Sequence, residues 1–448
     1  MKQQIDLLEG PILPSLTKLA FPIMATSLVQ MAYNMTDMIW IGRISSDAVA
    51  AVGAAGMYMW LSNGLATLAK MGGQVKVGHA LGAKQKEEAV SFAQSSIQLG
   101  IFFGVLFGLI TILFASPLIG FFKLNSPQVI FDAKIYLRIT CGAVLFSFMN
   151  QIFTGIIIAM GNSRTSFLAT TIGLVANIIL DPVFIFGIGI FPPMGVMGAA
   201  IATVIAQAIV MLVFLIVLAK DELIFKKLKI FRKPDYNSLK QIIQIGFPTG
   251  IQSMIFTGIS MVIARMIAGF GDTAVAVQKV GSQIESISWM TAEGFAAAVN
   301  SFVAQNFGAK NDTRVHKGYR VSMGIVLIWG AVCTMLLIVL PGPIFEIFIP
   351  DRSILPMGIS YLQILGFSQL FMCIEITTAG AFAGLGKTLP PSVVGIALTS
   401  ARIPLALLLT NTALGLDGIW WSITISSIFK GIVLFIWFRH YLKKGVSF

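Results

Sequence analysis

Two aspartates lie inside long apolar segments of this sequence, where carboxylates are rare. Asp37 lies in QMAYNMTDMIW, three residues after Asn34, and Asp181 lies in VANIILDPVF, four residues after Asn177. Spacings of three and four residues place the members of each pair on one face of a helix. An aspartate in mid-membrane costs about 2.5–3.5 kcal/mol even on the most lenient insertion scale, which indicates that these two acids serve a function.

The chemistry open to such a pair is proton or cation binding. Two carboxylates that meet in a medium of low dielectric constant cannot both ionise cheaply. They can hold one proton between them, or share Na⁺ with the two amide oxygens. Pro182 lacks an N–H, so it frees the carbonyl of Ile178 as a further ligand and can also bend or hinge the helix at this point. Thr203 in the next apolar segment can add a hydroxyl. The simpler alternative is that each acid only hydrogen-bonds to a neighbouring helix, or that Asp37 reaches the membrane surface.

The elements that must hold these side chains are membrane helices. The chain has 448 residues, of which 56% are hydrophobic and 11% charged, whereas about a quarter of an average soluble protein is charged. We therefore predict an all-α polytopic membrane protein of about twelve transmembrane helices, each long enough to cross about 30 Å of hydrocarbon. The apolar segments lie at residues 14–42, 47–72, 88–116, 130–158, 165–190, 195–219, 241–267, 272–301, 318–345, 357–383, 390–412 and 416–440.

A basic segment at residues 220–240, KDELIFKKLKIFRKPDYNSLK, separates six apolar segments on each side. We expect an amino-terminal lobe at 1–219, a linker at 220–240 and a carboxy-terminal lobe at 241–448. An even number of spans places both termini and the linker on one side of the membrane. Lysine and arginine gather in the connections on that side, so we predict that it is cytoplasmic. This orientation accounts for the net charge of +12 without nucleic-acid binding, for which no basic soluble domain exists.

The two halves of the sequence repeat. Similar stretches recur at offsets of about 225–226 residues, and a long-period repeat indicates duplicated architecture. Six spans per half give both halves the same orientation, related by a pseudo-twofold axis along the membrane normal, as is typical of secondary transporters. The stretches matched at these offsets include Phe21-Pro22 with Phe247-Pro248, Gly82-Ala83-Lys84 with Gly308-Ala309-Lys310, and Gly161 with Gly386. Gly195-x-x-Gly198 also matches Gly415-x-x-Gly418, at an offset of 220.

Several motifs together resemble the multidrug and toxic compound extrusion (MATE) family, of the multidrug/oligosaccharidyl-lipid/polysaccharide exporter superfamily. They are LLEGPILPSLTKLAFP, QMAYNMTDMIWIGRISSDAVAAVG, ANIILDPVFIFGIG followed by GVMGAAIATVIAQ, and FVAQNFGAKND, and the resemblance covers essentially the whole chain. It implies two six-helix lobes that form a V-shaped cleft, and export of small organic cations or amphiphilic drugs driven by H⁺ or Na⁺ with no other cofactor. We expect a monomer in the bilayer of a bacterial cell.

The resemblance also implies roles for residues of the first half. Asp37 matches a first-helix aspartate of the family, and Asn177 and Asp181 match its fifth-helix asparagine and aspartate. Thr203 matches a sixth-helix threonine. Pro22 matches a first-helix proline whose kink is proposed to change with protonation; a simple helix bend is the alternative.

The second half departs from one branch of the family, which carries an acid in helix seven where this chain has Gln252 in GFPTGIQSMIFTG. Glu375 lies near the helix-ten acid position, and Glu285 and Glu293 lie about 80° apart around the eighth segment. These three glutamates can form a second acidic site that binds cationic substrate or carries protons. Alternatively they are buried and paired with Arg265, Lys279 or Arg402. We therefore expect ion coupling in the amino-terminal lobe.

The chain contains 21 methionines and 34 phenylalanines, which suit an adaptable apolar cleft. We expect the cleft to be lined by Met31, Met35, Phe153, Gln252 and Met254. The three cysteines lie in apolar segments and indicate core packing, not a disulfide framework. The two Gly-Ala-Lys stretches lack the phosphate-binding loop pattern, which argues against ATP as the energy source.

Three other functions are weighed against the exporter. A flippase for a lipid-linked saccharide precursor, from the same superfamily, often carries extra helices and a more cationic cavity, which this sequence does not show. A membrane enzyme needs a His-rich, Cys-His or Ser-His constellation within the spans, and none is evident. A passive channel fits poorly with the duplicated lobes.

Overall fold

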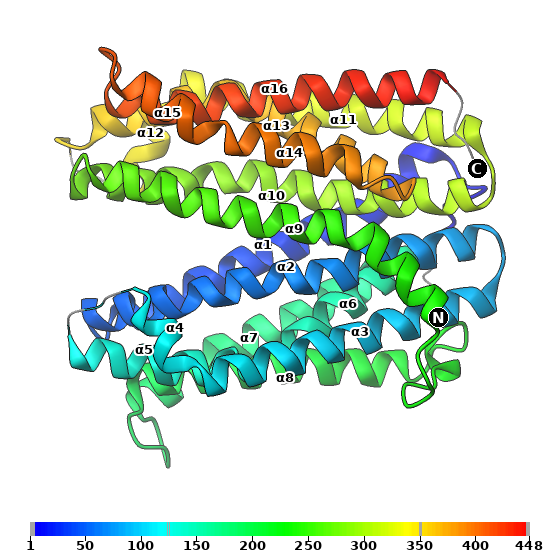
Figure 1. Ribbon diagram of the computed structural model, residues 1–448, viewed down its shortest axis with the longest axis horizontal. Helices are drawn as coiled ribbons and strands as arrows, with labels where there is room; N and C mark the ends of the chain where they lie inside the picture. The colour runs from blue at the N-terminus through cyan, green and yellow to red at the C-terminus, as the bar shows by residue number, and fades with distance from the viewer. Residues whose placement is uncertain (1–4, 123, 125, 349–351, 445–448) are drawn as a thin grey trace. The chain divides into compact units, whose positions relative to one another are not determined.

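The computed structural model describes residues 5–122, 124, 126–348 and 352–444, and the regular secondary structure in these residues is helical (Figure 1). The first half contains α1 (Ile12–Gly42), α2 (Ser46–Gly82), α3 (Lys86–Leu113), α4 (Ala115–Gly120), α5 (Pro127–Thr140), α6 (Leu145–Ala159), α7 (Arg164–Phe186) and α8 (Gly195–Leu218). The connection to the second half contains a short 3₁₀ turn, η1 (Phe225–Lys227). The second half contains α9 (Tyr236–Ala268), α10 (Asp272–Gly308), α11 (Asp312–Val339), α12 (Pro341–Glu346), α13 (Leu355–Gly384), α14 (Leu389–Ser400), α15 (Arg402–Thr410) and α16 (Leu416–Lys443).

The predicted all-α membrane fold is confirmed. Within the described residues, nine helical spans are long and apolar enough to cross a membrane, and the pair α5–α6, bent by 45°, makes a tenth. Helices α2 and α10 are longer still, at 37 residues each, but carry more polar side chains. Together these elements account for all twelve predicted segments.

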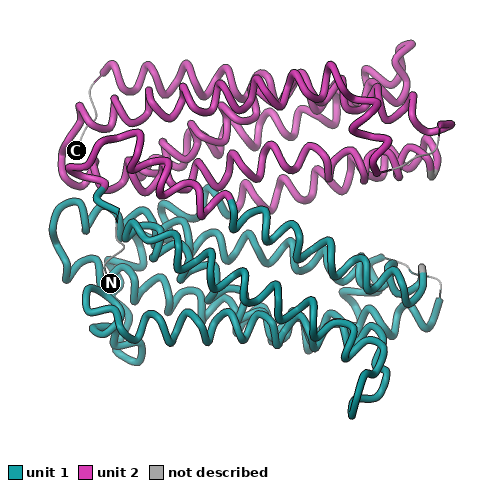
Figure 2. Tube along the Cα trace, turned by 180° about the vertical axis from the view of Figure 1, so that it is seen from behind, with its two compact units in different colours: residues 1–6, 25–250 teal, residues 7–24, 251–448 magenta. Residues whose placement is uncertain are grey.

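The chain packs as two compact units (Figure 2). Unit 1 comprises Met1–Asp6 and Ala25–Gly250, and unit 2 comprises Leu7–Met24 and Ile251–Phe448. The boundaries fall inside α1 and α9, two residues after Pro22 and Pro248 respectively. The packing boundaries therefore differ from the lobe limits expected from the sequence, because each unit includes the first turns of the helix that opens the other half.

Glycines allow the first turns of α9 to pack against α2 in unit 1, and those of α1 to pack against α10 in unit 2. In unit 1, a Cβ at Gly246 of α9 would overlap the carbonyl oxygen of Leu68 on α2. In unit 2, a Cβ at Gly294 of α10 would lie 2.8 Å from the Cα of Met24 on α1. Small residues let helix backbones approach closely in a membrane, where van der Waals packing and not the hydrophobic effect drives association.

The repeat is clearest at two matched turns. Helices α2 and α10 both end in a Gly-Ala-Lys stretch, and Lys84 and Lys310 adopt left-handed backbone angles, with φ of 60° and 56°. The Lys84 N–H donates to the carbonyl of Leu81 at 3.0 Å, and the Lys310 N–H donates to that of Phe307 at 2.9 Å. This is a Schellman cap, which usually carries glycine at the left-handed position.

The lysine at this cap predicts a measurable strain. A left-handed conformation costs a residue with a side chain about 1–2 kcal/mol, so Lys310→Gly should raise the thermal unfolding midpoint of the detergent-solubilised protein, and Lys310→Val should lower it. Lys317→Gly, on the exposed face of α11, is the matched control and should destabilise by about 1 kcal/mol. A glycine at 310 that destabilises as much as one at 317 would contradict this interpretation.

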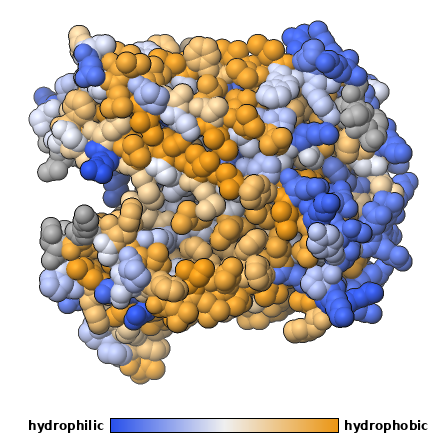
Figure 3. Space-filling view, in the orientation of Figure 1, coloured by the Kyte–Doolittle hydropathy of each residue, from blue (hydrophilic) through white to orange (hydrophobic). Residues whose placement is uncertain are grey.

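Both units expose apolar side chains along their helices. On the visible face in Figure 3, apolar residues form a band along the helices of each unit. Residues of α3 such as Phe102, Leu109 and Leu113 are more than half exposed, whereas Phe148 and Phe214 are fully buried in the core of unit 1. Apolar side chains that face lipid do not have to be buried against other protein residues. Polar groups inside each unit, by contrast, need hydrogen-bond partners, and their presence there has to be explained.

Candidate functional site

Three helices of unit 1 bring the predicted first-half acids together. Helix α1 supplies Asp37, α7 supplies Asn177 and Asp181, and α8 supplies Thr203. Asn177 and Asp181 are 0% and 1% exposed, and Asp37 is half-buried. Helices α7 and α8 pack closely because Gly198 lies against the backbone of Phe184.

The contacts within this cluster are specific. The Asn177 amide Nδ2 donates to Asp181 Oδ1 at 3.1 Å. Thr203 Oγ1 lies 3.5 Å from Asp37 Oδ2 and 3.0 Å from the carbonyl oxygen of Ala199, so its single proton can serve one acceptor at a time. Asp37 and Asp181 lie close enough to repel each other electrostatically when both are ionised. The two acids predicted from separate helices thus meet in one place.

Two tyrosines that the sequence analysis missed complete the cluster. Tyr33 on α1 and Tyr136 on α5 both lie near Thr203 and interact electrostatically with both carboxylates. Tyr33 precedes Asp37 by four residues, so helical spacing alone could have found it. No local sequence signal indicates Tyr136, because it comes from a different helix just before the bend at residues 141–144.

Several oxygens of the cluster are buried without a hydrogen-bond partner. They are Asp37 Oδ1, Asn177 Oδ1, Asp181 Oδ2 and the hydroxyl of Tyr33. Buried polar atoms in proteins normally have a partner, so a set of unsatisfied oxygens in one place calls for an explanation. Among the residues that the structure describes, no lysine, arginine or histidine forms an ion pair with either carboxylate. The arrangement is suited to accept a proton or a small cation.

Three other predicted residues lie outside these contacts. Asn34 on α1 is exposed, and none of the hydrogen bonds described for the cluster involves it. Its position three residues before Asp37 is therefore not sufficient to bring it among the buried groups. Pro22 and Pro182 lie inside α1 and α7 without ending either helix, and a hinge role for them stays a prediction.

The residues expected to line a cleft occupy different environments. Phe153 is only 5% exposed and packs in the core of unit 1 against Phe214 and Phe225, at ring-centroid distances of 5.9 and 6.1 Å. Phe153 is therefore a core residue of unit 1 in this structure, and a contact with substrate stays a prediction. The remaining side chains are half-buried or exposed, and their role stays a prediction: Met31, Met35, Gln252 and Met254.

In unit 2, Glu285 of α10 has a partner for each carboxylate oxygen. Tyr361 donates its hydroxyl to Oε1 at 3.0 Å, and Gln369 donates its amide to Oε2 at 3.2 Å. Arg402 at the start of α15 adds an electrostatic attraction. Glu293, two turns along α10 from Glu285, is exposed, so these two glutamates do not form one buried site.

Glu375 is held by a basic residue that the sequence analysis overlooked. Lys430 Nζ on α16 lies 2.9 Å from Glu375 Oε1 on α13, and the two side chains are only 6% and 11% exposed. Arg402 also attracts Glu375, while donating hydrogen bonds to Ser426 and Ser427 at 2.6 and 3.0 Å. Of the suggested partners, Arg402 thus interacts electrostatically with both Glu285 and Glu375. A single lysine inside the last apolar segment was the available signal for Lys430.

Comparison with known proteins gives consistent matches along the chain. The MatE family model matches residues 22–183 and 248–408. The chain is 31% identical over 426 residues to the probable multidrug resistance protein NorM of Thermotoga maritima, covering 94% of this chain and 91% of that protein. It is 23% identical over 422 residues to the multidrug export protein MepA of Staphylococcus aureus, covering 93% and 91%. A crystal structure of MATE in complex with MaL6 shares the fold, with a TM-score of 0.91 over 99% of both chains at 23% identity.

Proposed function

From the premise that this chain belongs to the MatE family, we propose that it is a cation-coupled multidrug exporter whose coupling ion binds at the acidic cluster of unit 1. Relatives that align over nine-tenths of the chain are named for multidrug resistance or multidrug export. Its substrates in this proposal are small organic cations and amphiphilic drugs, and its coupling ion is H⁺ or Na⁺.

The observation that best supports this proposal is that two carboxylates meet in unit 1 and that no described lysine, arginine or histidine forms an ion pair with either of them. Asp37 and Asp181 would repel each other strongly if both were ionised in a medium of low dielectric constant. A proton on one of them, or a Na⁺ between them, removes that repulsion. A proton on one carboxylate would make it a donor to one of the unpartnered oxygens, whereas Na⁺ could be coordinated by oxygens of Asp37, Asn177 and Asp181 together. Carboxylate, amide and hydroxyl oxygens are the ligand types that hard cations prefer.

Coupling requires that ion and drug stabilise different conformations. Helix α1 is suited to convert ion binding into a conformational change, because it carries Asp37 and has turns in both units. We propose that ion loading changes the conformation of α1 near Pro22 and lowers the affinity for drug. Moving a two-state equilibrium from 1:99 to 99:1 takes about a 10⁴-fold difference in ligand affinity, which sets the scale of the effect.

Unit 2 is less suited to bind the coupling ion. Glu285 has a hydrogen-bond donor for each oxygen, and Glu375 forms an ion pair with Lys430. A bound cation would have to displace the donors to Glu285, or would be repelled by the positive charge of Lys430 beside Glu375. We therefore assign these two acids to the stability of unit 2, and ion coupling to unit 1.

The proposed location is the plasma membrane of a bacterial cell, with both termini and the linker at 220–240 in the cytoplasm. Support comes from the positive-inside rule, since short connections with an excess of lysine and arginine stay in the cytoplasm. Basic residues of these connections include Lys84, Lys86, Arg164, Lys310, Lys317, Lys387 and Lys443.

The test is to impose each ion gradient separately on the purified protein. In proteoliposomes loaded with ethidium or norfloxacin, an opposing H⁺ or Na⁺ gradient should drive drug movement well above that of protein-free vesicles. Collapse of the effective gradient with an ionophore should return the rate to the protein-free value. Drug movement that responds to neither gradient would overturn the proposal, and rescue of a cell-wall precursor defect in cells would then favour the flippase.

A further inference from the structure

The connection between α8 and α9, residues 219–235, is folded onto unit 1 and is not a loose tether. Gln94 and Gln98 lie one turn apart on α3 and both contact its backbone. Gln94 Oε1 accepts a hydrogen bond from the Lys229 N–H at 3.0 Å. Gln98 Nε2 donates to the carbonyl oxygens of Ile230 and Arg232, both at 2.8 Å. Side chains of a membrane helix thus fix the path of the connection.

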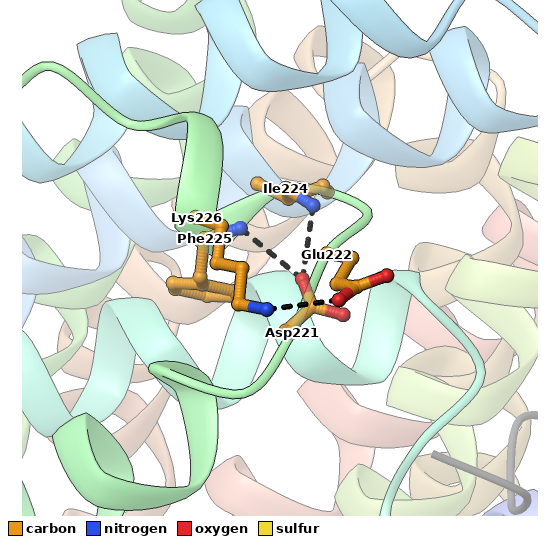
Figure 4. A network of polar contacts seen from close by, with 5 residues as sticks. All are labelled: Asp221, Glu222, Ile224, Phe225 and Lys226. Atoms are coloured by element: carbon orange, nitrogen blue, oxygen red, sulfur yellow. Dashed lines mark hydrogen bonds and ion pairs between the residues drawn. The ribbon is translucent and has the colours of Figure 1, made fainter.

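The two ends of the connection are fixed as well. The buried Asp221 carboxylate accepts from the N–H groups of Ile224 and Phe225 at 2.9 and 3.1 Å and so holds the first turn (Figure 4). At the other end Asp235 caps the start of α9. Its carboxylate accepts from the backbone N–H groups of Asn237 and Ser238 at 3.2 and 3.3 Å, and also from the Ser238 hydroxyl at 2.6 Å. The acids of this segment are therefore largely engaged in shaping its backbone.

Phe231 lies between the two carbonyl groups that Gln98 holds, and its side chain is 105% exposed. The hydrogen bonds from Gln98 hold the backbone on both sides of Phe231, so this exposed position has a defined place on the connection. A single exposed apolar residue is ordinary on a protein surface. Phe231 differs because its flanking backbone is fixed against α3 and because most charged residues of the connection are basic.

The basic side chains around Phe231 are exposed. They are Lys220, Lys226, Lys227, Lys229, Arg232 and Lys233. Within the described part of the chain, only Lys226 of this set forms an ion pair, with Glu222 at 2.8 Å (Figure 4). The α8–α9 connection therefore combines a cluster of exposed positive charges with one exposed aromatic side chain, Phe231.

The position of the connection between two membrane spans indicates how close it lies to the membrane surface. It joins α8 and α9, both of which are long and apolar enough to span the membrane. The outward face of α9 begins with Tyr236, which is 75% exposed, and continues through Lys240 and Ile243 to Phe247. Tyrosine and lysine at the end of a span mark the membrane–water interface. Phe231 lies five residues before Tyr236 and therefore close to that interface.

We propose that the α8–α9 connection is a binding site for anionic phospholipid headgroups of the membrane in which the chain resides, with Phe231 inserted among the headgroups. The exposed lysines and arginine supply the electrostatic attraction, and the ring supplies apolar contact, a combination that binds segments to anionic membrane surfaces. This site is separate from the acidic cluster, and it holds whether or not the proposed coupling is correct.

A fluorescent probe at position 231 tests the proposal. The native cysteines Cys141, Cys333 and Cys373 are buried, so a Phe231→Cys variant can be labelled selectively with the environment-sensitive dye NBD. On titration of the full-length protein in detergent with mixed micelles of phosphatidylglycerol, the dye emission should shift to shorter wavelength, and phosphatidylcholine should have little effect. Nitroxide-labelled phosphatidylglycerol should quench the dye.

Charge-neutral variants separate lipid binding from simple contact with detergent. Changing Lys229, Arg232 and Lys233 to glutamine should raise the phosphatidylglycerol concentration at the midpoint by roughly fivefold per charge removed. The same dye on Lys387→Cys, in the exposed connection between α13 and α14, is the matched control and should respond weakly. Drug efflux of the triple variant verifies that it is folded.

Four results would overturn the proposal. The first is an equal response to phosphatidylglycerol and phosphatidylcholine, and the second is an unchanged midpoint in the triple variant. The third is a dye response that depends on protein concentration and not on lipid, which would indicate contact with a second copy. Soluble polyphosphate that shifts the dye as strongly as the lipid would instead assign the site to soluble polyanions.

Discussion

An Asp181→Asn variant is expected to insert and fold normally but to lose ion-coupled drug efflux, by about 100-fold in initial rate, near the upper range of coupling energies between two ligand sites. Asparagine has nearly the same shape as aspartate and can keep the contact with Asn177, but it can neither take up a proton nor neutralise Na⁺. The measurement is the drug flux of purified protein in proteoliposomes under an imposed gradient, with thermal unfolding as the check on folding.

Two companion variants sharpen this prediction. Asp132→Asn, on α5, removes a carboxylate whose described hydrogen bond is to the exposed Gln128, and it should transport at the wild-type rate. Asp37→Asn should resemble Asp181→Asn, and the double variant should be no worse than either single one, because residues that act as one unit are not additive. Wild-type flux in Asp181→Asn would remove the acidic cluster from the mechanism.

The second large effect is expected for Lys430→Met in unit 2. This change leaves the Glu375 carboxylate buried without its partner at 2.9 Å. Removing one member of a buried ion pair typically costs about 3–5 kcal/mol, because the remaining charge is uncompensated. The thermal unfolding midpoint should therefore fall by several degrees, although Arg402 supplies part of the missing attraction.

The double variant Lys430→Met with Glu375→Met should recover most of that stability, since apolar replacement of a whole buried pair is often neutral. Lys226→Met, which breaks the exposed pair with Glu222, is the control and should leave the midpoint unchanged. If the stable double variant also retains coupled efflux, Glu375 is structural. If it is stable but uncoupled, the assignment of coupling to unit 1 alone is wrong.

Much of the fold can be predicted from the sequence, because a membrane helix is recognised by the length of its apolar segment. The twelve predicted segments correspond to helices or broken helices of the structure, and the internal repeat is visible in the matched caps at Lys84 and Lys310. The exchange of first turns between α1 and α9 does not follow, because apolar length indicates that a helix is buried in a membrane but not which neighbour it packs against. The close approach at Gly246 is a tertiary property.

Sequence patterns are limited in the same way for polar residues, because they do not show which residues of different helices come together. Helical spacing correctly brings Asn177 next to Asp181, because a pair within one helix is fixed by its geometry. It fails for Asn34, because the rotation of α1 within unit 1 decides which side of Asp37 is buried. Lys430 and Glu375 lie on different helices, so no local pattern relates them. The functional role of the acidic cluster stays a prediction until the variants are measured.

The exchanged turns of α1 and α9 make the two halves of the chain depend on each other. Each unit is completed by a helix segment encoded in the other half of the sequence. Either half produced alone would therefore lack helical turns that belong to the packing of its own unit.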